Sequence, residues 1–151
     1  MEAEIIQKYG NKVRVRVCGL CWHQSRLLMV NHKGLREGDF WAPPGGGLEF
    51  GETLEQVLIR EFKEETGLNV TIGQFLFIHE HIQKPLHAIE IFYQVTLLSG
   101  ELSIGMDPET ETKVISDVRW MDIEEIEKIA PVEKHRFFST SKLSFDWRKI
   151  G

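Results

Sequence analysis

The sequence lacks the features that mark membrane and secreted proteins. Its longest apolar runs fall short of the ~18 residues that a membrane-spanning helix needs. Its start, Met-Glu-Ala-Glu, is acidic and has neither the basic region nor the apolar core of a secretory signal. We therefore expect a cytoplasmic protein that does not contact a membrane.

Cysteine is also scarce, because Cys18 and Cys21 are the only two in the chain. Four zinc ligands would require a second pair of cysteines or histidines at suitable spacing. The two residues lie in an apolar, β-branched stretch typical of a strand, where positions three apart face opposite sides. We expect two ordinary buried thiols that do not meet.

The chain has no surplus of basic residues. Its formal net charge is -5, with 18 Lys and Arg against 23 Asp and Glu. This balance disfavours a protein that binds nucleic acid regardless of sequence, which would carry a basic face. A small-molecule nucleotide substrate remains compatible, because a bound metal ion can supply positive charge locally.

What remains is the composition of one soluble domain, with 151 residues, 42% of them apolar. We expect residues 1–151 to form a single domain with no internal repeat. The Pro- and Gly-rich stretch Trp41 to Gly47 is excluded from a helix or a central strand, and Lys33 to Phe40 has the composition of a loop. Alternating or β-branched segments predict a mixed sheet covered by helices, with strands over 13–17, 26–30, 70–79, 88–98 and 114–121 and helices over 53–66 and 123–129.

The segment from Thr53 to Thr66 carries the clearest helix signals. It contains no Gly or Pro, and Thr53 with Gln56 three residues later matches a capping box. Gly67 is the residue expected just beyond the helix C-terminus.

One face of this helix changes from apolar to acidic along its length. At about 100° per residue, Leu54, Val57 and Leu58 share an arc with Glu61, Glu64 and Glu65. Three neighbouring carboxylates repel one another, and the helix dipole disfavours negative charge near the C-terminus. A divalent cation would remove both penalties. A solvated acidic patch, with Arg60 and Glu64 as a helical ion pair, is the alternative from these residues alone.

The surrounding residues resemble the Nudix box. Residues 46 to 68 read GGLEFGETLEQVLIREFKEETGL. They meet every fixed position of the pattern G-x5-E-x7-R-E-U-x-E-E-x-G-U, where U is a bulky apolar residue. Phe62, an aromatic residue at a position that is usually aliphatic, is the one small departure. The matching positions are Gly46, Glu52, Arg60, Glu61, Glu64, Glu65 and Gly67, with Phe62 and Leu68 at U.

This resemblance implies an α/β (α+β) fold, a Nudix-like α/β/α sandwich with a central mixed sheet. It also implies that Mg²⁺ or Mn²⁺ binds a diphosphate against the box. Glu61, Glu64 and Glu65 match the metal-binding and catalytic carboxylates, with Glu61 also a candidate general base. Gly46 lies where a backbone carbonyl joins the metal ligands. Arg60 and Glu52 match a pair that supports these carboxylates or takes part directly.

Candidates outside the box are fewer and less specific. Glu109 and Glu111 are acids in a polar segment, either additional ligands or solvated loop residues. Glu90 points either into the cleft or into an ion pair. Arg14 and Arg16 either bind substrate phosphates or belong to an exposed strand face. Trp41 either stacks on a base or packs in the core or on the surface. We interpret His79, His81 and His87 as ordinary histidines, because they lack convincing metal-ligand spacing.

The function expected from these residues is metal-dependent pyrophosphohydrolysis of a nucleoside diphosphate linked to another group. ADP-ribose-cleaving relatives carry a proline downstream of the box, and Pro85 follows Leu68 by seventeen residues. The alternatives are ordinary or 8-oxo nucleoside triphosphates, in a housecleaning role, and diadenosine polyphosphates. A non-catalytic nucleotide-sensing domain would predict lost box carboxylates, and RNA decapping would favour a basic surface. Many relatives are dimers, so a homodimer is one option for the assembly.

Overall fold

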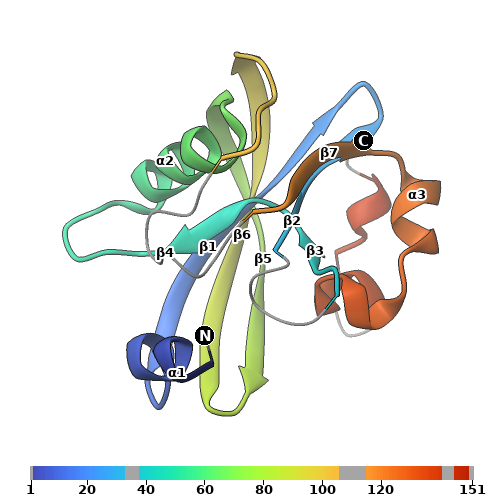
Figure 1. The fold of residues 1–151 in the computed structure, drawn as a ribbon. Helices are drawn as coiled ribbons and strands as arrows, with labels where there is room; N and C mark the ends of the chain where they lie inside the picture. Colours follow the sequence, from blue (N-terminus) through green and yellow to red (C-terminus); the bar gives the residue numbers. More distant parts are fainter. Residues whose placement is uncertain (1, 33–37, 106–114, 141–144, 150–151) are drawn as a thin grey trace.

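A mixed seven-stranded sheet forms the centre of the computed structural model, which describes residues 2–32, 38–105, 115–140 and 145–149 (Figure 1). The main strand order is β3-β2-β1-β6-β5, with β4 pairing with β1 and β7 with β2. Strands β1 and β6 run parallel, whereas the other pairs are antiparallel. The strands are β1 (Val13–His23), β2 (Arg26–Asn31), β3 (Trp41–Ala42), β4 (Gly45–Gly47), β5 (Asn69–Gln83), β6 (Leu86–Ser99) and β7 (Asp117–Met121).

Helices lie on both sides of this sheet (Figure 1). The α-helices are α1 (Glu2–Tyr9), α2 (Leu54–Thr66) and α3 (Ile123–Lys128), and the 3-10 turns are η2 (Pro131–Glu133), η3 (Arg136–Ser139) and η4 (Trp147–Lys149).

The two largest apolar clusters, one on each face of the sheet, hold these layers together. Under α2, Val17 and Cys21 pack with Val57, Leu58 and Phe62. The opposite face packs against α3 and the 3-10 turns, and its core contains Cys18, Leu20, Phe92, Ile126, Phe137 and Trp147. The expected α/β/α sandwich is therefore confirmed.

The two cysteines behave as expected from their spacing. Cys18 and Cys21 are both buried, they belong to cores on opposite faces, and no disulfide joins them.

Helix α2 begins and ends where its capping residues predict. The Thr53 hydroxyl accepts a hydrogen bond from the Gln56 N–H at 3.1 Å, and the Gln56 side chain accepts one from the Thr53 N–H at 2.9 Å. Gly67 ends the helix with φ of 77°, a left-handed conformation that glycine adopts without strain. The predicted helix over 123–129 is likewise found as α3, with Ile129 as its C-cap.

Other elements extend beyond or differ from the prediction. Strand β1 continues to His23 because Val17 through Cys21 are buried on both faces, so the alternation that marked its start stops. The Pro- and Gly-rich stretch supplies the short strands β3, which pairs with β2, and β4, which pairs with β1. Helix α1 and the 3-10 turns were not predicted. Part of the expected loop at 33–40 and the first residue of the expected strand at 114–121 lie outside the described residues.

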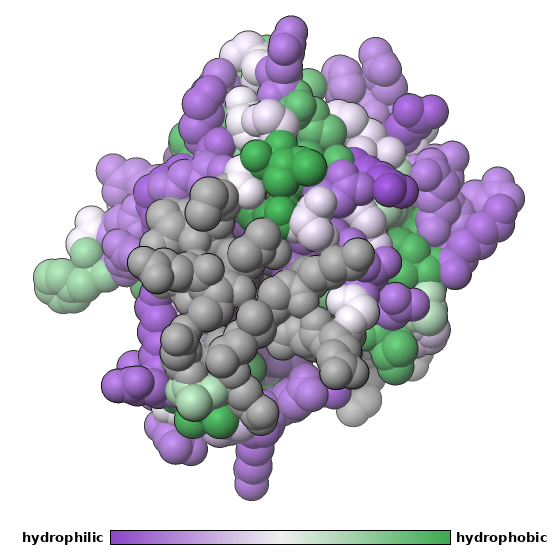
Figure 2. Space-filling view, viewed as in Figure 1, coloured by the Kyte–Doolittle hydropathy of each residue, from purple (hydrophilic) through white to green (hydrophobic). Residues whose placement is uncertain are grey.

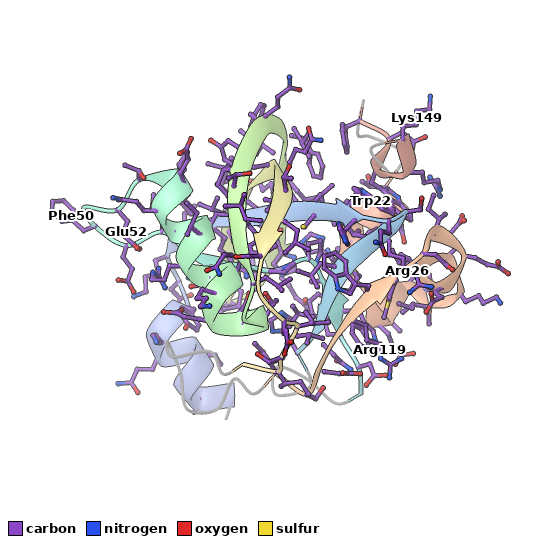
Figure 3. All side chains as sticks on the ribbon, turned by 90° about the horizontal axis from the view of Figure 1, so that it is seen from above. Trp22, Arg26, Phe50, Glu52, Arg119 and Lys149 are labelled. Atoms are coloured by element: carbon purple, nitrogen blue, oxygen red, sulfur yellow. The ribbon has the colours of Figure 1, made fainter. Side chains whose placement is uncertain are left out.

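The described surface in Figure 2 is mainly hydrophilic, with scattered apolar residues. The most exposed apolar side chain is Phe50, which points away from the sheet beside Glu52 in the loop before α2 (Figure 3). Within the described part of the chain, no helix has the length and apolar character needed to cross a membrane.

Candidate functional site

The acidic half of the α2 face is buried at two positions and partly exposed at a third. Glu61 and Glu65, one turn apart, are fully buried, whereas the Glu64 side chain is 31% exposed. Buried carboxylates need opposite charge or hydrogen-bond donors, because transfer out of water disfavours the charged form. The contacts around this face therefore decide what it can bind.

Arg60 links three of the box carboxylates. Its Nε and Nη2 donate to the two oxygens of Glu52 at 2.9 and 2.8 Å, a bidentate pair. Its Nη1 donates to Glu61 at 3.0 Å and to Glu64 at 3.3 Å. The hydrogen bond to Arg60 holds the pKa of Glu52 below its usual value, and the same bond chiefly raises the pKa of Arg60. This guanidinium therefore stays charged among the acids.

Strand β4 contacts the other side of the carboxylate set. The Gly45 N–H donates to Glu65 at 3.0 Å. Gly46 lies so close to Glu61 that a Cβ at this position would overlap its carboxylate. A larger residue at this position would have to displace the Glu61 side chain, and glycine lets the backbone of the Gly-rich strand come within reach of the acids.

This donor set fits a hard divalent cation. It offers oxygen ligands alone, which Mg²⁺ prefers, and it carries four carboxylates, Glu52, Glu61, Glu64 and Glu65, around the one guanidinium of Arg60. A cation would stabilise this excess of negative charge, because two of the four carboxylates, Glu61 and Glu65, are fully buried. The residues predicted from the box thus come together as the resemblance implies.

Arg16 and Glu90 lie on neighbouring strands close to β4. Arg16 pairs in register with Gly47 of β4 and with Glu90 of β6. Its Nη1 donates to Glu90 at 3.1 Å. Burial opposes the charge of Arg16, but Cys18 and the carboxylates of Glu90, Glu65 and Glu61 outweigh it and raise its pKa. The guanidinium therefore lies in the electrostatic field of the box acids.

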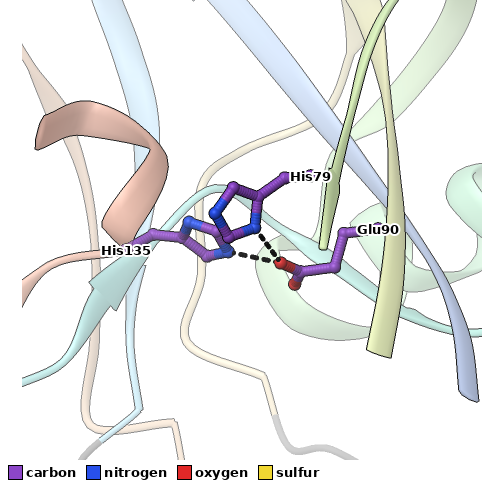
Figure 4. Close-up of side chains that lie close together, drawn as sticks. All are labelled: His79, Glu90 and His135. Atoms are coloured by element: carbon purple, nitrogen blue, oxygen red, sulfur yellow. Dashed lines mark hydrogen bonds and ion pairs between the residues drawn. The ribbon is translucent and has the colours of Figure 1, made fainter. Parts of the chain in front are cut away.

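Glu90 also contacts two histidines (Figure 4). His79 Nδ1 and His135 Nε2 both meet the same Glu90 oxygen, at 3.1 and 2.8 Å. The three ligand atoms lie within 4.8 Å of one another, close enough to be considered as a metal site. The spacing of the histidines along the sequence did not indicate that His79 would lie in this group, and Glu90 forms the ion pair that was one of its two predicted roles.

The remaining candidates lie away from the box carboxylates or outside the described residues. The Arg14 guanidinium lies over the Tyr9 ring of α1, 3.9 Å from its centroid. Trp41 is only 6% exposed and belongs to a core, with Arg119 over its ring. Pro85 lies in the turn between β5 and β6, where its carbonyl accepts a hydrogen bond from the Asn11 N–H. Glu109 and Glu111 lie outside the described residues.

A small cavity of about 30 Å³ adjoins this part of the sheet. Its lining combines Arg16, His32 and His135 with Phe40, Pro43 and Phe92. Neither His32 nor His135 was among the candidates from the sequence, because neither belongs to a recognisable motif.

The arrangement agrees with comparisons to known proteins. The family model of the NUDIX domain matches residues 10–140. An ADP-ribose pyrophosphatase of Methanocaldococcus jannaschii is 29% identical over 118 residues, which cover 77% of this chain and 66% of that protein. Nucleoside triphosphatase NudI of Enterobacter sp. is 30% identical over 137 residues, covering 85% of this chain and 96% of that protein. The chain therefore spans about two thirds of the length of the archaeal protein, and 45% and 59% of the lengths of two further curated relatives.

Solved structures show the same fold. The MutT protein from Methanosarcina mazei matches with a TM-score of 0.68 and 18% identity, covering 85% of this chain and 88% of that one. Together with the family match over most of the chain, these findings establish that this chain belongs to the Nudix family of hydrolases.

Proposed function

We propose that this protein is a metal-dependent pyrophosphohydrolase that cleaves the phosphoanhydride bond of a nucleoside diphosphate linked to another group, such as ADP-ribose or a nucleotide sugar. One observation carries this proposal. Two fully buried carboxylates, Glu61 and Glu65, face the Gly-rich β4, with the partly exposed Glu64 beside them. Arg60 offsets the charge of Glu61, and a bound cation would offset the negative charge of the other carboxylates, which burial otherwise disfavours.

The contacts of the box residues indicate which of them would bind the metal ion and which orient the metal-binding carboxylates. Glu61, Glu64, Glu65 and the Gly46 carbonyl would hold Mg²⁺ or Mn²⁺, which when bound neutralises diphosphate oxygens and acidifies water. Arg60 and Glu52 keep the carboxylates oriented through the bidentate pair and its two further hydrogen bonds. A carboxylate of this set accepts the proton of the attacking water.

The substrate class is supported by the relatives rather than by the box. The archaeal ADP-ribose pyrophosphatase favours a linked nucleoside diphosphate. The similarity to a nucleoside triphosphatase over 96% of its length favours nucleoside triphosphates as the second candidate. A non-catalytic sensing domain is disfavoured because each box carboxylate is present, and Arg60 and the Gly45 N–H hold these carboxylates close to one another. A cytoplasmic location and a homodimer remain predictions.

A rate comparison across substrate classes tests the proposal. The panel holds ADP-ribose, UDP-glucose, ordinary and 8-oxo nucleoside triphosphates and diadenosine polyphosphates, each with Mg²⁺ and separately with Mn²⁺. We expect ADP-ribose or the nucleotide sugar to have the highest kcat/KM, by at least about tenfold, a difference of 1.4 kcal/mol in transition-state binding. Preference for a triphosphate would move the assignment to the second candidate. Metal binding without turnover of any compound would support a sensing domain instead.

A further inference from the structure

Glu90 is buried, yet it gathers donors from three separate elements. Its side chain is 2% exposed, and it contacts Arg16 of β1 through one oxygen and His79 of β5 and His135 through the other. Burial alone would raise its pKa, but His135, His79 and Arg16 outweigh burial and hold the pKa far below its usual range. Glu90 is therefore a charged carboxylate fixed from both sides.

The hydrogen bonding of His135 identifies it as a donor to Glu90. Its Nδ1 accepts a hydrogen bond from the Phe137 N–H at 3.1 Å, so this nitrogen carries no proton. In the neutral ring the proton then lies on Nε2, which faces Glu90 at 2.8 Å. A metal bound at Nε2 would move the proton to Nδ1, opposite the Phe137 N–H. The His79–Glu90–His135 group is thus better suited to hydrogen bonding than to metal binding.

The segment that carries His135 is anchored on both sides. Lys134 Nζ donates to the Ile126 carbonyl of α3 at 3.0 Å, and the His135 N–H donates to the Trp41 carbonyl of β3 at 2.9 Å. Because these contacts fix the position of His135, Glu90 is held by rigid elements.

The fixed position of Glu90 in turn orients the Arg16 guanidinium, which donates a hydrogen bond to it. Arg16 pairs in register with Gly47, and the neighbouring Gly46 lies against the Glu61 carboxylate. The ion pair with Glu90 of β6 holds the guanidinium at this part of β1. The ion pair with Glu90 uses an N–H of Arg16 Nη1. A guanidinium has five N–H donors, so others can bind a phosphate bidentately.

We propose that Glu90 is a positioning residue for substrate binding, which holds the Arg16 guanidinium beside the metal site to grip a phosphate, while His79 and His135 hold Glu90 in place. This inference rests on the proposed function to the extent that the ligand is a nucleoside diphosphate. It assigns His79 and His135 to support of this pair rather than to a second metal centre.

A double-mutant cycle on ligand binding tests the coupling. The probe is α,β-methylene-ADP, which is not cleaved, titrated calorimetrically with Mg²⁺ into the wild type, Arg16→Gln, Glu90→Gln and the double variant. We expect each single variant to weaken binding about tenfold, and the double variant to bind no more weakly than Arg16→Gln, because Glu90 acts through Arg16. Additive losses, about 100-fold in the double variant, would overturn the proposal, as would failure of the wild type to bind the probe.

Matched variants separate positioning from a general loss of structure. Glu80→Gln breaks a similar glutamate–histidine contact, 2.9 Å to His87, at an exposed site on the same hairpin, and should leave binding unchanged. Glu90→Asp keeps the charge but withdraws it from Arg16, so it should fold and still weaken binding. A loss of Mg²⁺-induced thermal stabilisation in Glu90→Gln would contradict the proposal, because the box metal site should be intact.

A second titration distinguishes the alternative metal centre. Zn²⁺ is added to a variant with Glu61, Glu64 and Glu65 changed to Gln, with and without His135→Gln. We expect Zn²⁺ binding to be the same with and without His135→Gln. If one Zn²⁺ per protein binds and this binding is lost in His135→Gln, the three residues form a metal centre and the assignment is overturned. Both titrations measure binding, so they can show the coupling between Arg16 and Glu90 even if no substrate is turned over. Failure of the proposed function would appear in the substrate panel instead.

Discussion

Glu64→Gln should lower kcat by at least about 100-fold, the scale on which enzymes lose rate when one group that stabilises transition-state charge is removed. The substitution keeps the size of the side chain and removes its negative charge. The Glu64 side chain is 31% exposed and makes only a 3.3 Å contact to Arg60, so the core is not affected. We expect an unchanged thermal unfolding temperature without metal, alongside the loss of turnover measured at saturating Mg²⁺.

The control for this variant lies on the same helix. Glu55 is exposed in the first turn of α2, away from the box carboxylates, so Glu55→Gln makes the same chemical change outside the site. This control should retain wild-type kcat. Near-normal turnover in Glu64→Gln would show that Glu64 is not part of the metal site.

Arg60→Gln should destabilise the metal-free protein by about 2 kcal/mol, because it leaves the fully buried Glu61 without the guanidinium that compensates its charge. Breaking a buried ion pair costs roughly 3–5 kcal/mol, and partial exposure of Arg60 reduces this figure. For a chain of this length we expect the unfolding temperature to fall by roughly 4–8 °C. Urea unfolding in EDTA measures the change in free energy.

Two further variants identify the cause of that loss. Arg60→Gln combined with Glu61→Gln should recover much of the stability, because the uncompensated buried charge is removed as well. Lys63→Gln removes a positive charge from an exposed position of the same helix, where Lys63 reaches only the Gly67 carbonyl at 3.4 Å. It should cost less than about 1 kcal/mol. Equal losses in Arg60→Gln and Lys63→Gln would contradict a specific role of Arg60.

The sequence was informative where structure depends on local spacing. The capping box of α2, its glycine end and the acidic face are all set by residues within one helix, where a fixed rotation per residue relates position to direction. Leu58, Glu61 and Glu65 therefore turn toward the sheet as their spacing predicts. The opposite orientations of Cys18 and Cys21 follow equally from the strand repeat.

Contacts between distant segments could not be predicted in this way. Glu90 meets His79 from 11 residues away and His135 from 45 residues away. The first contact depends on the register of β5 against β6, which contains bulges, and the second on how the segment after α3 packs against β3. The contacts of Arg14 and Trp41 depend in the same way on distant segments, since Tyr9 and Arg119 reach them from other elements.

The most direct test of the proposed activity follows ADP-ribose by phosphorus NMR in the presence of the protein and Mg²⁺. We predict that the diphosphate signals are replaced by two phosphomonoester signals, from AMP and ribose 5-phosphate, and that EDTA or Glu64→Gln stops the conversion. Diphosphate signals that persist with wild-type protein and Mg²⁺, or that disappear equally with Glu64→Gln, would contradict it.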